Sequence, residues 1–385
     1  MTRVLVAPDK FKGTLTSAEV ASHLAEGLRA ARPDVETNTA AIADGGDGLL
    51  DAFEAAGFER VHVRATDALG AVAWSAYVRR EGQAVVELAE VAGLAACRSD
   101  RAPLTATSRG VGEVIAAALD AGCRHVLLGI GGSASTDGGI GMVQALGARV
   151  LDSAGGEVGP GGAGAMQAVA IDLTFLHPAL AEARLEVACD VDNPLTGPSG
   201  AAAVYGPQKG ADDRQVQLLD AALGRWADLV SRTTGTDLRA TAGAGAAGGV
   251  GYAALSLLGA DLRPGARLVL DILDIPASIA RADLVITGEG SLDEQTLRGK
   301  APAAVAESAR KAGVPVVVVA GQCHLDAAQI GAAGFSHVYT LLEEAGSDEE
   351  AFASPGPLLR RIGARIAQTL GPVEGGDGRR LASCP

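Results

Sequence analysis

The fold is decided by residues 282–300, whose sequence is ADLVITGEGSLDEQTLRGK. Leu284, Val285 and Ile286 form a short apolar run between Asp283 and Gly288, and such a run predicts a buried parallel strand. A polar loop follows it, and a helix-like run begins at residue 303. In open α/β sheets, ligands bind beyond the carboxyl ends of the strands. We therefore expect the polar side chains of this loop, among them Glu289, Asp293 and Lys300, to belong to a binding site.

The order of strand, polar loop and helix recurs along the chain. Residues 3–7 predict a strand, the next six residues a loop with Asp9 and Lys12, and Thr16 or Ser17 can cap a helix that runs to about residue 31. Further strands are predicted at residues 185–191, 316–320 and 336–342, and a closing helix at residues 358–370. This repetition indicates an α/β fold built on a doubly wound parallel sheet.

Composition limits the classes of function. The net charge of −14 disfavours a nucleic-acid partner, because phosphate backbones are bound by basic surfaces. Five widely spaced cysteines without a CxxC pair suggest neither a disulfide framework nor a zinc site. The chain opens on a strand pattern, and no apolar run approaches the roughly 20 residues of a bilayer span. We expect a cytoplasmic protein without a membrane partner, as a monomer or homodimer.

The pattern changes after residue 60. Three runs of alternating residues between 60 and 88 predict an antiparallel meander, unlike the units on either side. We interpret it as the start of a second domain inserted into the first. The expected domains are residues 1–60 with 275–372, an inserted mixed α/β domain over residues 61–274, and a flexible tail over residues 373–385.

A glycine-rich segment, GIGGSASTDGG, occupies residues 129–139 and follows a predicted strand at 125–129. Backbone amides of such a loop, here near Gly131, Gly132 and Ser133, can hold phosphate oxygens. The spacing of Gly129, Gly131 and Ala134, with Asp152 further on, also fits a loose dinucleotide fingerprint. A NAD(P)-dependent dehydrogenase of a small hydroxy acid is therefore an alternative, and a passive sugar-acid sensor is a second one.

Paired aspartates mark two other loops. Asp44 and Asp47 lie on either side of a glycine pair in AIADGGDG, where the backbone can turn tightly and approach a ligand. Asp190 and Asp192 are two residues apart at a predicted strand end, so both can reach one cation. A loop shaped by glycine and proline follows them and carries Lys209.

Six blocks together resemble the bacterial type I glycerate kinases: APDKFKGTLTS, AIADGGDG, GIGGSASTDGG, CDVDNPLTGPSGAAAVYGPQKGA, GAGAAGG and ITGEGSLDEQTLRGK. The blocks follow one another along the chain in the same order as in that family, and the resemblance covers about residues 2–371. It implies phosphorylation of D-glycerate by ATP with Mg²⁺, with 2-phosphoglycerate as the favoured product. It also implies a flavodoxin-like domain with an inserted mixed-sheet domain, and a site between the two.

On this basis we assign candidate roles. Phosphoryl transfer needs a metal ion, cations and a base, and no Walker A loop is present. Asp190 and Asp192 are the expected Mg²⁺ ligands with Asp293 as the alternative, and either Asp44 or Asp190 is the base. The candidate catalytic residues are Asp44, Asp190 and Lys12; the substrate-binding residues Asp9, Lys12, Asp47, Arg109 and Ser133; and the nucleotide-binding residues Gly131, Gly132, Lys209, Glu289 and Lys300.

Overall fold

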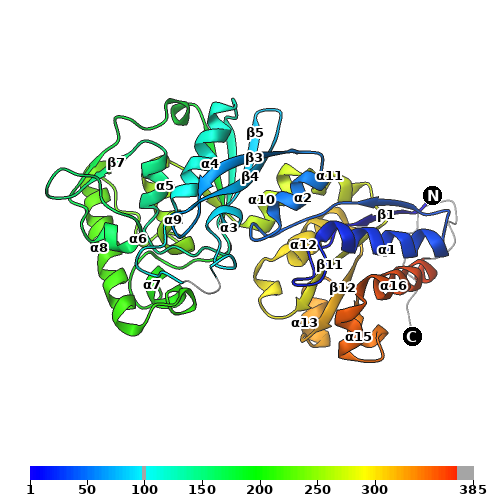
Figure 1. Ribbon diagram of the computed structural model, residues 1–385. Helices are drawn as coiled ribbons and strands as arrows, with labels where there is room; N and C mark the ends of the chain where they lie inside the picture. The colour runs from blue at the N-terminus through cyan, green and yellow to red at the C-terminus, as the bar shows by residue number, and fades with distance from the viewer. Residues whose placement is uncertain (98–100, 371–385) are drawn as a thin grey trace. The chain divides into compact units, whose positions relative to one another are not determined.

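The computed structural model describes residues 1–97 and 101–370, and Figure 1 traces them. The chain divides into two compact units. Unit 1 comprises Met1–Asp44, Asp51–Ala56 and the chain from Ala266 onward, and unit 2 comprises Gly45–Leu50 and Gly57–Gly265. The domain boundaries expected near residues 60 and 274 stay a prediction, and the expected tail lies outside the described residues.

Unit 1 is built on a parallel five-stranded sheet with the order β13-β12-β11-β1-β2. Counted along the unit, this order is 2-1-3-4-5 read from the β2 edge, which is the flavodoxin-like arrangement. The expected fold class is thereby confirmed. The strands are β1 (Arg3–Val6), β2 (Glu36–Thr39), β11 (Leu284–Leu292), β12 (Val316–Cys323) and β13 (His337–Thr340).

Helices cover both faces of this sheet. On one face, α1 and α16 lie side by side and pack their apolar residues on Val4 and Val6 (Figure 1). As expected, Thr16 caps α1, and Glu19 completes a capping box. The helices of unit 1 are α1 (Ser17–Ala31), α10 (Gly265–Ile272), α11 (Ile275–Ala280), α12 (Ala301–Ala312), α13 (Ala327–Ala332), α14 (Leu341–Glu344), α15 (Asp348–Ala353) and α16 (Pro355–Thr369).

The strand at the centre of the prediction is longer than its apolar run. β11 continues beyond Ile286 and ends only at Leu292, so Glu289 and Ser291 lie in a strand and not in a loop. The reason is that β12 is also longer and pairs with it as far as Leu292 and Cys323. By contrast, β13 ends at Thr340, and the predicted strand at 185–191 ends at residue 188.

Unit 2 contains a mixed six-stranded sheet with the order β10-β9-β6-β5-β4-β3. Strands β3, β4 and β5 form the predicted antiparallel meander, whereas β5, β6, β9 and β10 pair in parallel. The strands are β3 (Glu59–Thr66), β4 (Val72–Arg80), β5 (Gln83–Glu87), β6 (His125–Gly129), β9 (Arg184–Ala188) and β10 (Asp261–Arg263), and a separate antiparallel pair is formed by β7 (Arg149–Leu151) and β8 (Ala170–Asp172).

Two apolar clusters stabilise unit 2. One lies between the sheet and α4, α5 and α9, and the other is centred on α8, whose residues Leu219, Leu223, Trp226 and Val230 are buried. The helices of unit 2 are α3 (Leu88–Ala92), α4 (Arg109–Asp120), α5 (Ile140–Ala145), α6 (Gly161–Ala165), α7 (Ala201–Tyr205), α8 (Asp213–Thr234) and α9 (Val250–Leu258), with short 3₁₀ turns at Pro178–Ala181, Pro207–Lys209 and Ala246–Gly249. Helix α2 (Leu49–Ala55) begins in unit 2 and continues in unit 1, which also contains the 3₁₀ turn Thr296–Arg298.

Candidate active site

Three carboxylates of unit 1 share one electrostatic environment at the carboxyl ends of its strands. Asp9 follows β1, Asp44 follows β2, and Glu289 lies near the end of β11. Burial, and after it the charge of Asp44, raise the pKa of Asp9 to about 8. Burial also raises the pKa of Glu289, with contributions in the same direction from Asp293 and Asp44. Side chains associated with three separate strands thus lie close enough to influence one another's charge.

Glu289 is held by two residues from the segment that follows β11. The Thr296 hydroxyl donates a hydrogen bond to its Oε1, and the Lys300 Nζ lies 3.7 Å from its Oε2. Asp293 accepts backbone N–H groups from Gln295 at 2.8 Å and Thr296 at 3.3 Å, so its Oδ1 already stabilises the local turn. The loop after β1 packs closely on this region, because a Cβ on Gly290 would lie 3.3 Å from the backbone nitrogen of Lys12. The Lys12 side chain is exposed.

The glycine-rich loop of unit 2 is organised around Asp137, which is fully buried. One carboxylate oxygen accepts the backbone N–H and the hydroxyl of Ser108, both at 2.8 Å, and the other accepts the N–H of Gly139 at 3.0 Å. Burial raises the pKa of Asp137, and these hydrogen bonds oppose the rise. Asp137 therefore fixes the path of the loop between β6 and α5.

Lys209 lies beneath the same loop. Its Nζ donates to the Ser133 hydroxyl at 2.8 Å and to the Ser135 carbonyl at 2.5 Å, and the residue is 3% exposed. Burial lowers its pKa to about 7, while the charge of Asp137 raises it. Within the described part of the chain, the buried hydroxyls of Ser135 and Thr136 have no hydrogen-bond partner. The loop thus contains the Lys209 amino group and the hydroxyls of Ser135 and Thr136, and these two hydroxyls can still form hydrogen bonds.

The aspartate loop over residues 45–48 packs on the glycine-rich loop. A Cβ on Gly131 would lie 2.7 Å from Gly46 Cα, and one on Gly129 would lie 2.5 Å from the Gly45 carbonyl oxygen. Only glycine permits backbones to approach so closely. Asp47 is exposed in this loop, between Gly46, which lies against Gly131 after β6, and Gly48, which donates its N–H to Glu87 at the end of β5.

Asp190 and Asp192 follow β9 and are exposed. Asp190 accepts the Gly265 N–H at 2.8 Å through one carboxylate oxygen. Among the described residues, no three His, Cys, Asp or Glu side chains form a group that could enclose a metal ion. Mg²⁺ needs no such cage, because it is commonly bound by one or two carboxylates, waters and substrate phosphates. The exposed pair after β9 fits this requirement.

Arg109 pairs with a residue of its own helix. It begins α4, is 46% exposed and pairs with Glu113 at 3.1 Å on the same helix. The residue before it, Ser108, makes the contacts with Asp137 that sequence reasoning missed. The missed signal is a Thr-Ser pair placed directly before a predicted helix, where hydroxyls bind backbone or neighbouring carboxylates.

Glu87 was missed as well. It ends β5, is 5% exposed and accepts the backbone N–H groups of Gly48 and Leu50 at 3.2 and 3.1 Å. A carboxylate at the end of the apolar run AVVEL was the available signal, because buried acidic side chains need partners.

The dehydrogenase alternative is not supported. In a dinucleotide fold the acidic residue ends the neighbouring parallel strand of the same sheet. Asp152 instead follows β7, which belongs to the separate two-stranded sheet, and its carboxylate accepts the N–H groups of Ala154 and Gly156 in a local turn. The helix that follows the glycine-rich loop begins only at Ile140.

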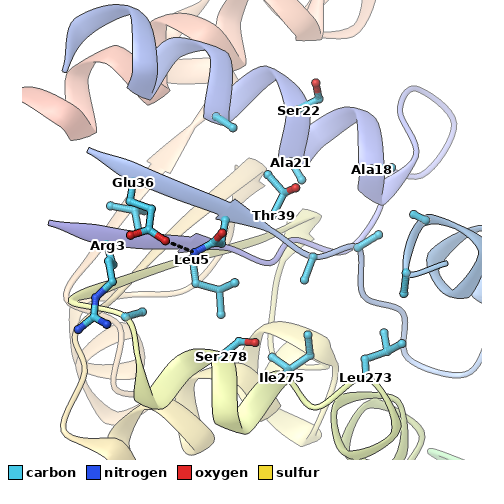
Figure 2. Close-up of a pocket in the computed structure, with 18 of the residues that line it drawn as sticks. Arg3, Leu5, Ala18, Ala21, Ser22, Glu36, Thr39, Leu273, Ile275 and Ser278 are labelled. Carbon is cyan, nitrogen blue, oxygen red and sulfur yellow. Dashed lines mark hydrogen bonds between the residues drawn. The ribbon is translucent and has the colours of Figure 1, made fainter. Parts of the chain in front are cut away.

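A hollow of about 610 Å³ in unit 1 lies away from these residues. Figure 2 shows it along the edge strand β2, with Glu36 and Thr39 on that strand and Ser278 on α11. None of the described residues that line it is a candidate site residue.

The fold and the site define a class. Both units carry acidic, basic and hydroxyl side chains where parallel strands end, which is the arrangement of α/β proteins that bind small anionic ligands. No helix within residues 1–97 or 101–370 is both long and apolar enough to cross a bilayer.

Comparisons with known proteins narrow this class. The family model described as "Glycerate kinase family" matches residues 4–371. A glycerate kinase of Bacillus subtilis is 41% identical over 96% of this chain and 97% of its own. A glycerate 2-kinase of Escherichia coli is 39% identical over 96% of this chain and 98% of its own. A crystal structure from Salmonella typhimurium LT2, assigned as glycerate kinase 2, has a TM-score of 0.87 at 41% identity and covers 96% of this chain and 98% of its own.

The chain belongs to the glycerate kinase family. The resemblance found in the six sequence blocks is thereby confirmed.

Proposed function

We propose that the protein transfers the terminal phosphoryl group of ATP to D-glycerate and forms 2-phosphoglycerate and ADP. Family membership over nearly the whole chain is the observation that carries the proposal. The choice of 2-phosphoglycerate is supported by the relative named glycerate 2-kinase. The sequence further favours a cytoplasmic enzyme that acts as a monomer or homodimer.

We assign proton acceptance to Asp44. The oxygen of the glycerate hydroxyl bonds to phosphorus, its proton passes to Asp44, and the bond from phosphorus to the ADP oxygen breaks. Asp44 is preferred to Asp190 because Asp190 is assigned to Mg²⁺ below, whereas Asp44 lies near the carboxyl groups of Asp9 and Glu289. Asp9 retains its proton near neutral pH and can donate a hydrogen bond to substrate, since its pKa is about 8.

Cations for the substrate carboxylate and the phosphates are available on both units. Lys12 is exposed beside Asp9 and is assigned to glycerate, together with Asp47, Arg109 and Ser133. The loop of Gly131 and Gly132 is assigned to the nucleotide phosphates, for which the buried Lys209 and the hydroxyls of Ser135 and Thr136 provide polar groups. Lys300, paired with Glu289, is assigned to the nucleotide as well.

Mg²⁺ would be held by Asp190 and Asp192, and when bound it would neutralise phosphate charge. Asp293 is the less suitable ligand, because its Oδ1 accepts two backbone N–H groups. The remaining work of the protein is to orient the hydroxyl and to exclude water as a competing acceptor.

The proposal is tested with an assay that couples ADP release to a spectroscopic signal. We expect turnover with D-glycerate, ATP and Mg²⁺ together and none when any of the three is omitted. A change in NADH fluorescence on adding protein, with no ADP released, would favour a dehydrogenase. Thermal stabilisation by glycerate without consumption of ATP would favour a sensor.

A further inference from the structure

Glu87 is a buried carboxylate to which the proposed reaction gives no role. It lies at the carboxyl end of β5, where it pairs with Gly129 of β6. Its Oε1 accepts the Gly48 N–H at 3.2 Å, and its Oε2 accepts the Leu50 N–H at 3.1 Å. One side chain thus satisfies two backbone donors that lie 39 and 37 residues away, at the start of α2.

These bonds complete the support of the aspartate loop. Gly45 has a φ of +92° and lies so close to the end of β9 that a Cβ on it would be 2.6 Å from Ala188 Cβ. Gly46 lies against Gly131 after β6. Glu87 supplies the third anchor, from β5. The loop is therefore fixed at the ends of three neighbouring strands, and its exposed Asp47 has a defined position.

An apolar residue in place of Glu87 would fill this space without the unfavourable free energy of burying a carboxylate. Burial raises the pKa of Glu87 to about 7, the two backbone hydrogen bonds lower it, and the charges of Asp47 and Glu90 raise it. Burying a carboxylate is unfavourable unless hydrogen bonds compensate. The hydrogen bonds to Gly48 and Leu50 compensate for the burial of the carboxylate. We infer that Glu87 serves to orient the loop.

We propose that Glu87 is a positioning residue that holds the loop of residues 45–48 so that Asp47 can bind the acceptor substrate. The inference rests on the proposed function for the identity of that substrate. The anchoring of the loop by Glu87 is independent of the proposed function and can be measured without turnover.

The experiment compares wild type with E87Q and E90Q. E87Q keeps the shape of the side chain, but its amide nitrogen must face a backbone N–H, so one hydrogen bond is replaced by two opposed donors. E90Q removes the same charge from an exposed position three residues further on and is the matched control. Each variant is examined by steady-state kinetics and by hydrogen exchange of the segment 45–50.

We expect E87Q to raise KM for glycerate about ten-fold or more, because a hydrogen bond to a charged group is lost, with a smaller change in KM for ATP. Exchange of segment 45–50 should become about ten-fold faster. E90Q should match wild type in both, and E87D, which keeps the charge but reaches less far, should lie between them. If E87Q is too unstable to assay, E87D is measured in the same way.

Unchanged exchange of the segment in E87Q would overturn the inference, and so would faster exchange with an unchanged KM for glycerate. If wild type releases no ADP with glycerate, the proposed function fails. The exchange measurement then still decides whether Glu87 anchors the loop.

Discussion

At the scale of single residues, Asp44 is the side chain on which the proposed chemistry depends most. General-base assistance is worth a factor of about 10²–10⁴ in rate. We expect D44N to lower kcat by that factor while KM for ATP changes little. Asp51, which is exposed on the helix that follows, provides the control variant D51N with near wild-type turnover. A D44N enzyme with an unchanged kcat at saturating substrates would remove Asp44 from the mechanism.

Asp9 gives a prediction about stability and pH. The unfolded chain loses the Asp9 proton near the ordinary pKa of 3.8, whereas the folded protein keeps it until about pH 8. The folded state binds more protons within this window, so its stability decreases as pH rises from about 4 to 8. Asn at this position removes the effect. From pH 5 to pH 8, the free energy of unfolding of D9N should gain about 1–3 kcal/mol relative to wild type.

Urea unfolding of both proteins at the two pH values measures this difference. Parallel pH dependence of wild type and D9N would show that Asp9 does not retain its proton in the fold.

Sequence patterns predicted residues whose role is local and missed those whose role depends on distant partners. Thr16 and Glu19 predict the start of α1, because both residues of the capping box lie within four positions of the sequence. The burial of Lys209 depends on Ser133 and Ser135, more than 70 residues away, so the sequence suggests a loop lysine. Glu87 was missed for the same reason, because its partners lie on another loop.

At the scale of elements, the same limit explains the length of β11. Its apolar residues end at Ile286, and the continuation to Leu292 follows from pairing with β12, which no local pattern contains. The helices and the meander were predicted well because their periodicity lies within each segment.

The contact between the two glycine loops of unit 2 predicts the effect of a single methyl group. In G131A the new Cβ would lie 2.7 Å from Gly46 Cα, and backbone cannot move aside cheaply. We expect the free energy of unfolding to fall by about 1–3 kcal/mol. G159A is the control, since a Cβ there meets nothing within 4 Å. Thermal melting compares the stability of the two variants. Equal melting temperatures would contradict the close packing of these loops.

Helix α8 allows a stabilising change. Gly224 lies in its interior, where a Cβ would meet nothing within 4 Å, so G224A should raise the free energy of unfolding by about 0.5–1 kcal/mol. Gly235 caps the same helix at φ 80°, and G235A should destabilise by about 1 kcal/mol or more. Chemical denaturation of both variants measures these effects. A gain in G235A would contradict the left-handed cap at the end of α8, and a loss in G224A would contradict the open space beside its interior.

At the scale of the whole molecule, both units contribute residues to the proposed reaction. The chain passes from unit 1 to unit 2 between Asp44 and Gly45 and returns between Leu50 and Asp51. The candidate base and the aspartate loop are therefore neighbours in sequence but belong to different units. The assignment to the glycerate kinase family supplies what the geometry of either unit alone does not, namely the identity of the acceptor.

The most direct test of the central claim is proton-coupled phosphorus NMR of the product formed from D-glycerate, ATP and Mg²⁺. In 2-phosphoglycerate the ester phosphorus couples to a single carbon-bound proton, so we expect a new doublet together with the signals of ADP. A triplet would show that the terminal hydroxyl is esterified and the product is 3-phosphoglycerate. Inorganic phosphate as the only new signal besides those of ADP would contradict the account, because the protein would then transfer the phosphoryl group to water.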